Sequence, residues 1–266
     1  MNVTDRVPMD KTIIENNRKA WNTATQYHNA GHDGALHKGF ADPNYTRFDD
    51  DKVKFIKDLD LAGKVVAHVQ TNNGRELISL MRASTAKEGV GFDISDDAIK
   101  VARELGAIAK VNARFERVNI FEIPEKYNGY FDFVYITEGS LSWLPCMDEY
   151  FKVMARLLKP GGKILIQEIH PVAFILHGTS GERVNYTDKG PHKMIHSLDY
   201  VGSIDYSPTD CNWFMHTMAD IWNALAKHDF EITQFTESTE DTGWMDAQDK
   251  MPNFPRSFVM LCAKRS

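Results

Sequence analysis

Short apolar runs alternate with helix-like patterns along most of the chain, and this alternation predicts an α/β fold. An apolar run at 65–69 is followed by a polar turn and then by apolar residues at helical spacing over 77–81. A second apolar run at 89–92 ends in Asp93, and another helical pattern follows over 95–105. These segments read as strand, turn, helix, strand and helix, which is the order of a βαβ unit.

The same reading extends over the rest of the chain. It predicts seven strands, which are 65–69, 89–92, 113–118, 131–136, 163–168, 230–235 and 257–263. It predicts further helices at 11–29, 49–61, 147–158 and 213–228, and a loop at 31–44, which is rich in Gly, His and Asp. The last two strands follow one another closely enough to suggest an antiparallel hairpin.

One segment breaks the regular alternation of strands and helices. Residues 172–212 contain several glycines and two prolines between the fifth predicted strand and the helix at 213–228. We interpret this segment as an insertion with hairpin character that lies over one edge of the sheet as a lid.

Composition narrows the class of protein. The chain has 266 residues and a net charge of −6, so no positive field for nucleic acid is expected. No apolar stretch approaches the length of a membrane span, and the N-terminus does not read as a signal peptide. Three cysteines without CxxC spacing predict reduced thiols in a cytoplasmic protein, and ten histidines without HxH or HExxH spacing predict no metal site.

The βαβ unit suggests a nucleotide-like ligand. Asp93 stands 19 positions after Gly74, a spacing at which an acid at the end of the second strand can accept hydrogen bonds from ribose hydroxyls. Only one glycine, Gly74, remains in the turn, so a plain βα turn without a ligand is the alternative interpretation.

The order of several motifs resembles the class I S-adenosylmethionine-dependent methyltransferase family, over about residues 62–264. The matching segments are KAWNTATQYHNA (19–30), GVGFDIS (89–95), Asn119-Ile120, YITEGSLSW (135–143) and RLLKPGGKILIQE (156–168). The resemblance implies a doubly wound, Rossmann-like seven-stranded sheet. It also implies an N-terminal helical cap over residues 1–48 and a methyltransferase domain over residues 49–266, which includes the lid.

The first motif of that family departs from its usual form here. The segment VVAHVQTNNG has His68 where the family has an acid, and Gln70 and Asn72 where it has glycines. Asparagine tolerates left-handed backbone conformations, so Asn72 is a workable substitute, whereas Gln70 is less easily accommodated. The departures leave open a member of the family that binds the cofactor without transferring a methyl group.

The resemblance implies which residues hold the cofactor, S-adenosylmethionine, and its product S-adenosylhomocysteine. They are Trp21, Tyr27, Gln70, Asn73, Gly74, Asp93, Ile94, Asn119, Ile120, Thr137 and Glu138. Glu138 and His170 follow strands and are candidate catalytic groups, since each could orient the acceptor or take a proton. Trp143, Tyr200 and His216 are candidates for the acceptor pocket. For each of these side chains, packing or helix capping is the alternative.

The function we expect is methyl transfer from S-adenosylmethionine to a small molecule. No Asn/Asp-Pro-Pro-Tyr/Phe segment follows the fourth strand, which argues against methylation of nucleic-acid bases. The Pro160-Gly161-Gly162 turn argues against a dehydrogenase. The sequence leaves open the acceptor, the methylated atom and the choice between monomer and homodimer. It also leaves open a non-catalytic or regulatory protein of the same fold.

Overall fold

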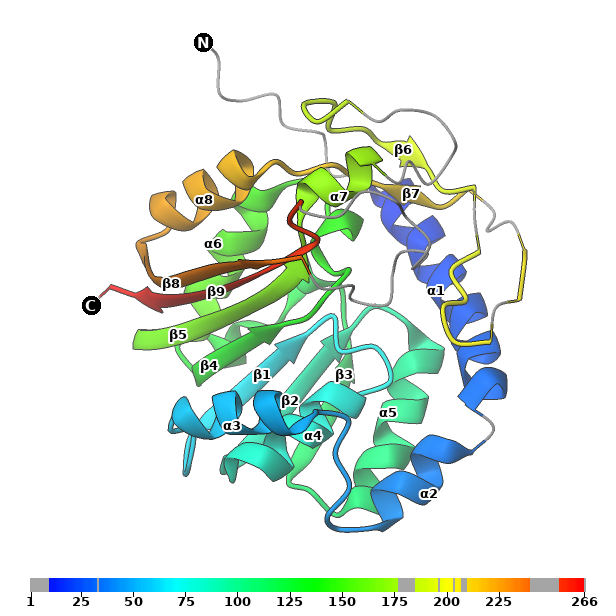
Figure 1. Ribbon diagram of the computed structural model, residues 1–266, viewed down its shortest axis with the longest axis vertical. Helices are drawn as coiled ribbons and strands as arrows, with labels where there is room; N and C mark the ends of the chain where they lie inside the picture. The colour runs from blue at the N-terminus through cyan, green and yellow to red at the C-terminus, as the bar shows by residue number, and fades with distance from the viewer. Residues whose placement is uncertain are drawn as a thin grey trace.

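A seven-stranded mixed β-sheet runs through the centre of the protein, as the computed structural model in Figure 1 shows. The structure describes residues 10–32, 34–176, 185–195, 197–202, 204–206, 210–239 and 254–265. The strands are β1 (Val65–Val69), β2 (Glu88–Asp93), β3 (Ala113–Arg117), β4 (Phe131–Ile136), β5 (Leu158–Ile169), β8 (Phe230–Ser238) and β9 (Ser257–Lys264). They lie in the order β3-β2-β1-β4-β5-β9-β8, with β9 antiparallel to both of its neighbours. The predicted seven-stranded sheet and terminal antiparallel hairpin are therefore confirmed.

Helices cover both faces of this sheet (Figure 1). One layer is formed by α3 (Asp50–Asp58), α4 (Arg75–Ser84) and α5 (Asp96–Ala109), and the other by α6 (Met147–Leu157) and α8 (Met218–Lys227). Side chains alternate between the layers, since Val66 packs with the first layer and the next residue, Ala67, packs with the second. Both are fully buried, which explains why the parallel strands read as continuous apolar runs.

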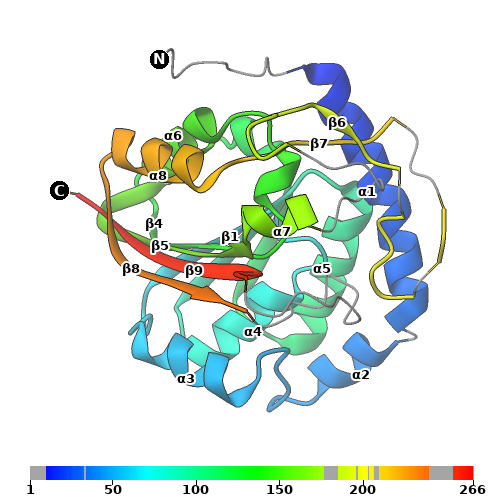
Figure 2. The same cartoon turned by 45° about the horizontal axis from the view of Figure 1, so that its top comes forward.

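A third apolar cluster joins the N-terminal helix to the inserted segment. Helix α1 (Lys11–His32) contributes Ala20 and Ala24, which pack with Met194 and Trp213 of the insertion. Helix α7 (Pro171–Leu176) lies at the start of the insertion, and a two-stranded antiparallel sheet joins β6 (His192–Lys193) within it to β7 (Asn212–Trp213) at its end. The hairpin character and the lid expected for the insertion stay predictions. Figure 2 shows β6 and β7 beside the upper part of α1.

Polar contacts fix α1 in this position. The side-chain amide of Asn17 donates to the carbonyl of Asn212 at 2.8 Å, and the backbone N–H of Asn212 donates back to Asn17 Oδ1 at 2.9 Å. Further along α1, Asn22 Oδ1 accepts a 2.7 Å hydrogen bond from Ser95, the residue that caps α5. Helix α1 is thus bonded both to the insertion and to the central βαβ unit.

The prediction of a loop over 31–44 is wrong for most of this segment. Helix α1 continues to His32, and a further helix, α2 (Ala35–Ala41), follows Gly34, whose φ of 71° lets the chain change direction between the two. Leu36 and Phe40, four residues apart, are both buried against the helix layer of α4 and α5. Tertiary packing of this pair outweighs the loop-like composition of the segment.

The predicted helix at 213–228 begins later in the structure. Asn212 and Trp213 form β7, and α8 starts only at Met218. A capping box explains this start, because Thr217 and Asp220 bond each other's backbone N–H groups. The helix at 147–158 is confirmed as α6, but the turn at 159–162 lies within β5 rather than between helix and strand.

Three features bear on the expectations from composition. Cys146, Cys211 and Cys262 are all free and buried. No helix in the described part of the chain is long and apolar enough to cross a lipid bilayer. Among the same residues, no group of three or more His, Cys, Asp or Glu side chains is arranged to hold a metal ion.

Candidate functional site

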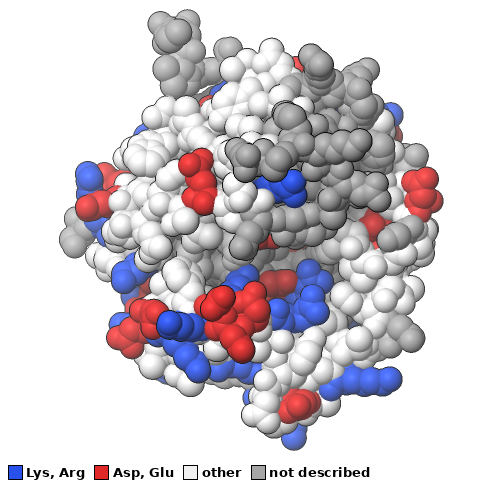
Figure 3. All heavy atoms as spheres, viewed as in Figure 1, with Lys and Arg blue, Asp and Glu red and all other residues white. Residues whose placement is uncertain are grey.

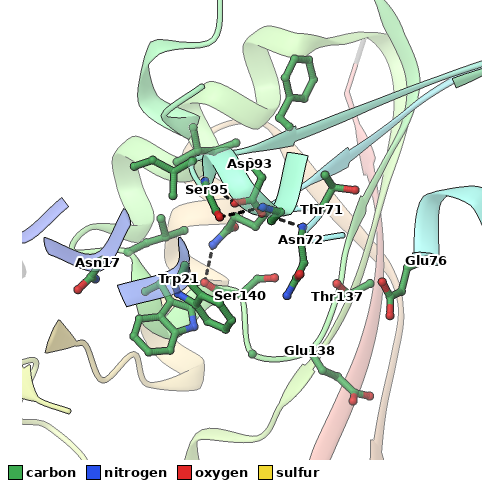
Figure 4. A pocket seen from close by; sticks show the side chains of 18 of the residues that line it. Asn17, Trp21, Thr71, Asn72, Glu76, Asp93, Ser95, Thr137, Glu138 and Ser140 are labelled. Atoms are coloured by element: carbon green, nitrogen blue, oxygen red, sulfur yellow. Dashed lines mark hydrogen bonds between the residues drawn. The ribbon is translucent and has the colours of Figure 1, made fainter. Parts of the chain in front are cut away.

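A cavity of about 280 Å³ lies where the carboxyl ends of the parallel strands meet α1 and the insertion. Open α/β sheets bind ligands at this edge, because the loops that leave neighbouring strands diverge there. Figure 3 shows acidic and basic side chains gathered beside a hollow on this face of the molecule. Figure 4 shows the cavity from close by, with Asp93 and Ser95 on one side of it and Glu76 and Glu138 on another.

Most of the residues expected at the site do line this cavity. They are Trp21, Gln70, Asp93, Ile94, Asn119, Ile120, Thr137, Glu138, Trp143 and Tyr200. They come from α1, from the segments that follow β1, β2, β3 and β4, and from the insertion. Residues more than 150 positions apart in the chain are therefore brought to one cavity.

Three of the expected side chains lie outside the lining because each faces another partner. The ring of Tyr27 packs against Tyr206, with 4.7 Å between their centroids. Nε2 of His216 donates to the carbonyl of Leu144 at 2.7 Å in the protein interior. His170 Nε2 lies 3.0 Å from a carboxylate oxygen of Glu237 on β8.

Asn73 and Gly74 are also outside the lining, and they shape the turn before α4. Gly74 has a φ of 77°, and a Cβ at this position would lie 2.6 Å from the Phe115 ring, so only glycine fits. Oδ1 of Asn73 accepts from the backbone N–H of Arg75 at 3.4 Å, at the start of the helix. These two residues support the loop from behind.

Asp93 ends β2 with its carboxylate held by backbone amides. Its Oδ2 accepts from Asn72 N at 2.7 Å, and its Oδ1 accepts from Ser95 N at 2.9 Å. Each carboxylate oxygen has a further lone pair, so both can still accept a hydrogen bond from a ligand. Burial raises the pKa of Asp93, and the backbone amides of Ser95, Asn72 and Ile94 oppose this shift.

Gln70 and Asn72 take the backbone conformation that glycine usually supplies in such a loop. Their φ angles are 54° and 49°. The side chain of Gln70 is itself held at both ends, since its Nε2 donates to the carbonyl of Ser140 at 2.7 Å and its Oε1 accepts from Tyr150 at 3.2 Å. The glutamine thus ties the turn after β1 to the turn after β4.

His68 is a buried, neutral residue behind the cavity. Its Nδ1 is 2.8 Å from the hydroxyl of Thr71, its Nε2 is 3.1 Å from the hydroxyl of Thr137, and its ring stacks on Tyr135. Burial lowers its pKa to about 4, so it carries no charge at neutral pH. It joins the ends of β1 and β4 through hydroxyl groups instead of supplying a carboxylate.

A second buried carboxylate fixes the turn after β4. Glu168 accepts hydrogen bonds from the backbone N–H groups of Gly139, Ser140, Leu141 and Ile169. Burial raises its pKa to about 7 against the effect of these amides. Sequence reasoning missed Glu168, which belongs to the strand motif at 156–168 but had no assigned role.

Two tryptophans form an apolar wall of the cavity. Trp21 on α1 and Trp143 after β4 meet edge to face, with 5.2 Å between ring centroids. The indole Nε1 of Trp143 is buried and has no hydrogen-bond partner among the described residues. An aromatic wall of this kind suits an apolar or aromatic ligand.

Charged and polar residues that the sequence did not single out line another part of the cavity. They are Lys52 of α3, Arg75 and Glu76 of α4, and Gln167 of β5. Arg75 and Glu76 pair with each other at 2.5 Å. For Arg75 and Glu76, the one feature of the sequence that could have identified them as site residues is that they directly follow Gly74. No such feature stands near Lys52.

This chain is similar in sequence to known methyltransferases. A family model described as "Methyltransferase domain" matches residues 63–224. The ubiquinone biosynthesis O-methyltransferase of Xanthomonas oryzae pv. oryzae is 30% identical over 146 residues, which are 54% of this chain and 59% of that protein. The chain thus spans less than two thirds of the length of the curated relatives that it matches.

Solved structures resemble the fold over more of the chain. An S-adenosylmethionine-dependent methyltransferase from Mesorhizobium loti has a TM-score of 0.60 at 17% identity and covers 80% of this chain and 96% of its own. Geranyl diphosphate C-methyltransferase from Streptomyces coelicolor A3(2), solved with S-adenosyl-L-homocysteine, has a TM-score of 0.63 at 15% identity. The match covers 97% of this chain and 99% of that protein. At these identities the resemblance concerns the fold.

Proposed function

Because the chain belongs to the methyltransferase domain family and has the class I, Rossmann-like fold of S-adenosylmethionine-dependent methyltransferases, we propose that it transfers a methyl group from S-adenosylmethionine to a small molecule. The observation that carries this proposal is the carboxylate of Asp93. It faces the cavity from the end of β2, and two backbone amides leave its remaining lone pairs for ribose hydroxyls.

The cofactor then extends over the ends of β1 to β4. Ile94, Ile120 and Asn119 would hold the adenine ring, and Asp93 would hold the ribose. Gln70 and Thr137 would lie at the methionine part. This arrangement is supported by the lining of the cavity, in which all these residues take part. His68 supplies no charge for the methionine ammonium, so the turn carbonyls and the polar side chains around Gln70 would hold it.

Methyl transfer is an in-line displacement on an activated carbon, so positioning and the exclusion of water supply much of the rate. Of the two catalytic candidates, Glu138 is the one that we retain. Glu138 lines the cavity, whereas His170 lies outside the lining beside Glu237. A general base has to reach the acceptor either directly or through one water molecule.

A small acceptor is supported by the size of the cavity and by its cover. Residues 1–48 as a cap and residues 172–212 as a lid enclose the site in this proposal, in line with the cluster that joins α1 to the insertion. The curated relative bears the name of an O-methyltransferase of ubiquinone biosynthesis, which is also consistent with a small acceptor. Three free thiols are consistent with a cytoplasmic setting.

The test is transfer of label from S-adenosylmethionine that carries a radioactive methyl group. The protein is incubated with the labelled cofactor and a fractionated small-molecule extract, and the label is followed into products. We expect label in one or a few fractions, and about 5- to 150-fold less label with an Asp93→Asn variant when the cofactor is below saturation. Absence of label from every fraction, together with failure to bind S-adenosylhomocysteine, would overturn the proposal.

A non-catalytic protein that binds the cofactor is the second candidate. The observation that favours it is the altered first motif, in which His68, Gln70 and Asn72 replace an acid and two glycines. Tight binding of S-adenosylhomocysteine without label in any fraction would support this candidate over the enzyme.

A further inference from the structure

Lys52 places an unpaired ammonium group at the cavity. It lies at the start of α3, where its backbone N–H donates to the capping residue Asp49 at 2.7 Å. Its Nζ lies 4.6 Å from the ring centre of Phe48 and 5.7 Å from that of Tyr135. Within the described part of the chain, no carboxylate oxygen comes within 4.0 Å of this ammonium. Lys52 is therefore held by aromatic rings and left without an ionic partner.

The other charges in the cavity are already matched. Arg75 pairs with Glu76, and the carboxylate of Asp93 accepts from two backbone amides. Glu138 differs, because Oε1 accepts from Gln167 Nε2 at 2.9 Å while Oε2 has no hydrogen bond within the described residues. One ammonium and one carboxylate oxygen thus remain for a ligand.

Among the charged groups, Glu138 has the largest effect on the pKa of Lys52, and Lys52 has the largest effect on the pKa of Glu138. The pKa of Lys52 is lowered by burial, and Glu138 opposes this shift ahead of Glu76 and Asp49, while Arg75 adds to it. Burial raises the pKa of Glu138, and Lys52 is the main influence against it. The two groups do not form an ion pair with each other, and both line the cavity, so each is available to a ligand bound there.

We propose that the acceptor atom is the oxygen of a weakly acidic hydroxyl group, a phenol or an enol, bound between the Lys52 ammonium and the Glu138 carboxylate. This inference rests on the function proposed above. A hydroxyl can accept from an ammonium, donate to a carboxylate and keep a second lone pair for attack. A neutral amine has a single lone pair, which a hydrogen bond from Lys52 would occupy, and a protonated amine is repelled by Lys52.

The reaction balances with these groups alone. The acceptor O–H proton passes to the Glu138 carboxylate, and the oxygen lone pair forms a bond to the methyl carbon of the cofactor. The carbon–sulfur bond breaks with its electron pair going to sulfur, so the sulfonium becomes the neutral thioether S-adenosylhomocysteine. Lys52 stabilises the negative charge that develops on oxygen, and Glu138 later releases its proton to water.

The test uses 4-nitrophenol, a phenol whose absorbance reports its ionisation, as the probe. The protein is saturated with S-adenosylhomocysteine and titrated with the probe at a series of pH values. We expect the pKa of the bound probe to fall by at least about one unit below that of the free probe. We also expect 4-nitroaniline, which matches the probe in shape, to bind at least about ten-fold more weakly than 4-nitrophenol.

Variants assign the shift to the two residues. Lys52→Met should abolish the lowering of the probe pKa, and Lys52→Arg should retain most of it. Lys54→Met changes an exposed lysine of the same helix and should leave the shift intact. Glu138→Gln should lower the probe pKa further, because it removes the negative charge that opposes the phenolate.

Titration of each protein with S-adenosylhomocysteine separates this inference from the proposed function. If the wild-type protein binds the product but shows no probe binding, an unshifted probe pKa or the same shift in Lys52→Met, the hydroxyl assignment is overturned and the methyltransferase proposal stands. Failure of the wild-type protein to bind S-adenosylhomocysteine would overturn both.

Discussion

The backbone N–H of Asn72 donates a 2.7 Å hydrogen bond to the carboxylate of Asp93, which ties the turn after β1 directly to the end of β2. The bond exists because Asn72 takes a φ of 49°, a conformation that asparagine tolerates better than most residues. The loop thus keeps a glycine-like path although its glycines have been replaced. The same carboxylate that shapes the loop is the one proposed to bind the ribose.

Replacing Asp93 by asparagine should weaken the binding of S-adenosylhomocysteine by about 1–3 kcal/mol, the cost of losing a charged acceptor for two hydroxyl groups. Asparagine keeps one acceptor oxygen and sets an NH2 group against the second of the two backbone amides, so urea unfolding of the variant accompanies the titration. Calorimetric titration measures the effect, and Asp97→Asn, next to the same helix start but outside the cavity lining, is the control. Equal affinity in the Asp93 variant and the wild type would mean that the ribose is held elsewhere.

The backbone conformation and the hydrogen bonds of Gln70 predict an order of stability among variants at this position. Replacement by alanine loses the hydrogen bonds to Ser140 and Tyr150 and keeps the unfavourable positive φ. Replacement by glycine loses the same bonds but adopts that φ without strain, so it should be more stable than the alanine variant by about 1 kcal/mol. Urea unfolding of both variants tests this order. An alanine variant as stable as the glycine variant would show that φ at this position relaxes.

Tyr200 connects the insertion to the loop after β1. Its hydroxyl accepts from Asn72 Nδ2 at 3.1 Å, and the Arg75 guanidinium lies 5.9 Å from the centre of its ring. Tyr200→Phe removes the hydrogen bond alone, and S-adenosylhomocysteine should then dissociate about 2- to 10-fold faster. Stopped-flow displacement measures this rate. Tyr206→Phe, on the same segment but outside the cavity lining, should have no effect, and a similar change in both variants would count against a specific contact.

His216 predicts a loss of stability in acid. Burial lowers its pKa from 6.5 to about 4 in the folded protein. Between these two pH values the unfolded chain binds the proton and the folded chain does not, so the free energy of unfolding falls as the pH falls through this window. His216→Gln should reduce that slope by up to about 1.4 kcal/mol per pH unit. Urea unfolding at several pH values is the measurement, and an unchanged slope would contradict the assignment.

The sheet could be predicted because its central strands are buried on both faces. Runs rich in apolar residues such as 131–136, which only Asp132 interrupts, therefore marked these strands, and Asp93 was found from its distance to Gly74. Helix α2 was not predicted, because its stability comes from Leu36 and Phe40 packing on helices that lie later in the chain. Composition of the local segment carries no information on such contacts.

Only some of the residues that line the cavity could be predicted from the sequence. A position after a strand places a side chain near the carboxyl edge of the sheet, but does not decide which way it turns. Glu138 turns into the cavity, whereas His170 lies beside Glu237 and His216 bonds a backbone carbonyl. Lys52 was missed because it belongs to a helix that precedes β1 and reaches the cavity only through the packing of α3 on the sheet.

The most direct test of the account is calorimetric titration of the wild-type protein with S-adenosylmethionine, S-adenosylhomocysteine and NAD. The account predicts binding of both sulfur compounds with one site per chain and no binding of NAD. Binding of neither sulfur compound, or binding of NAD in their place, would contradict it.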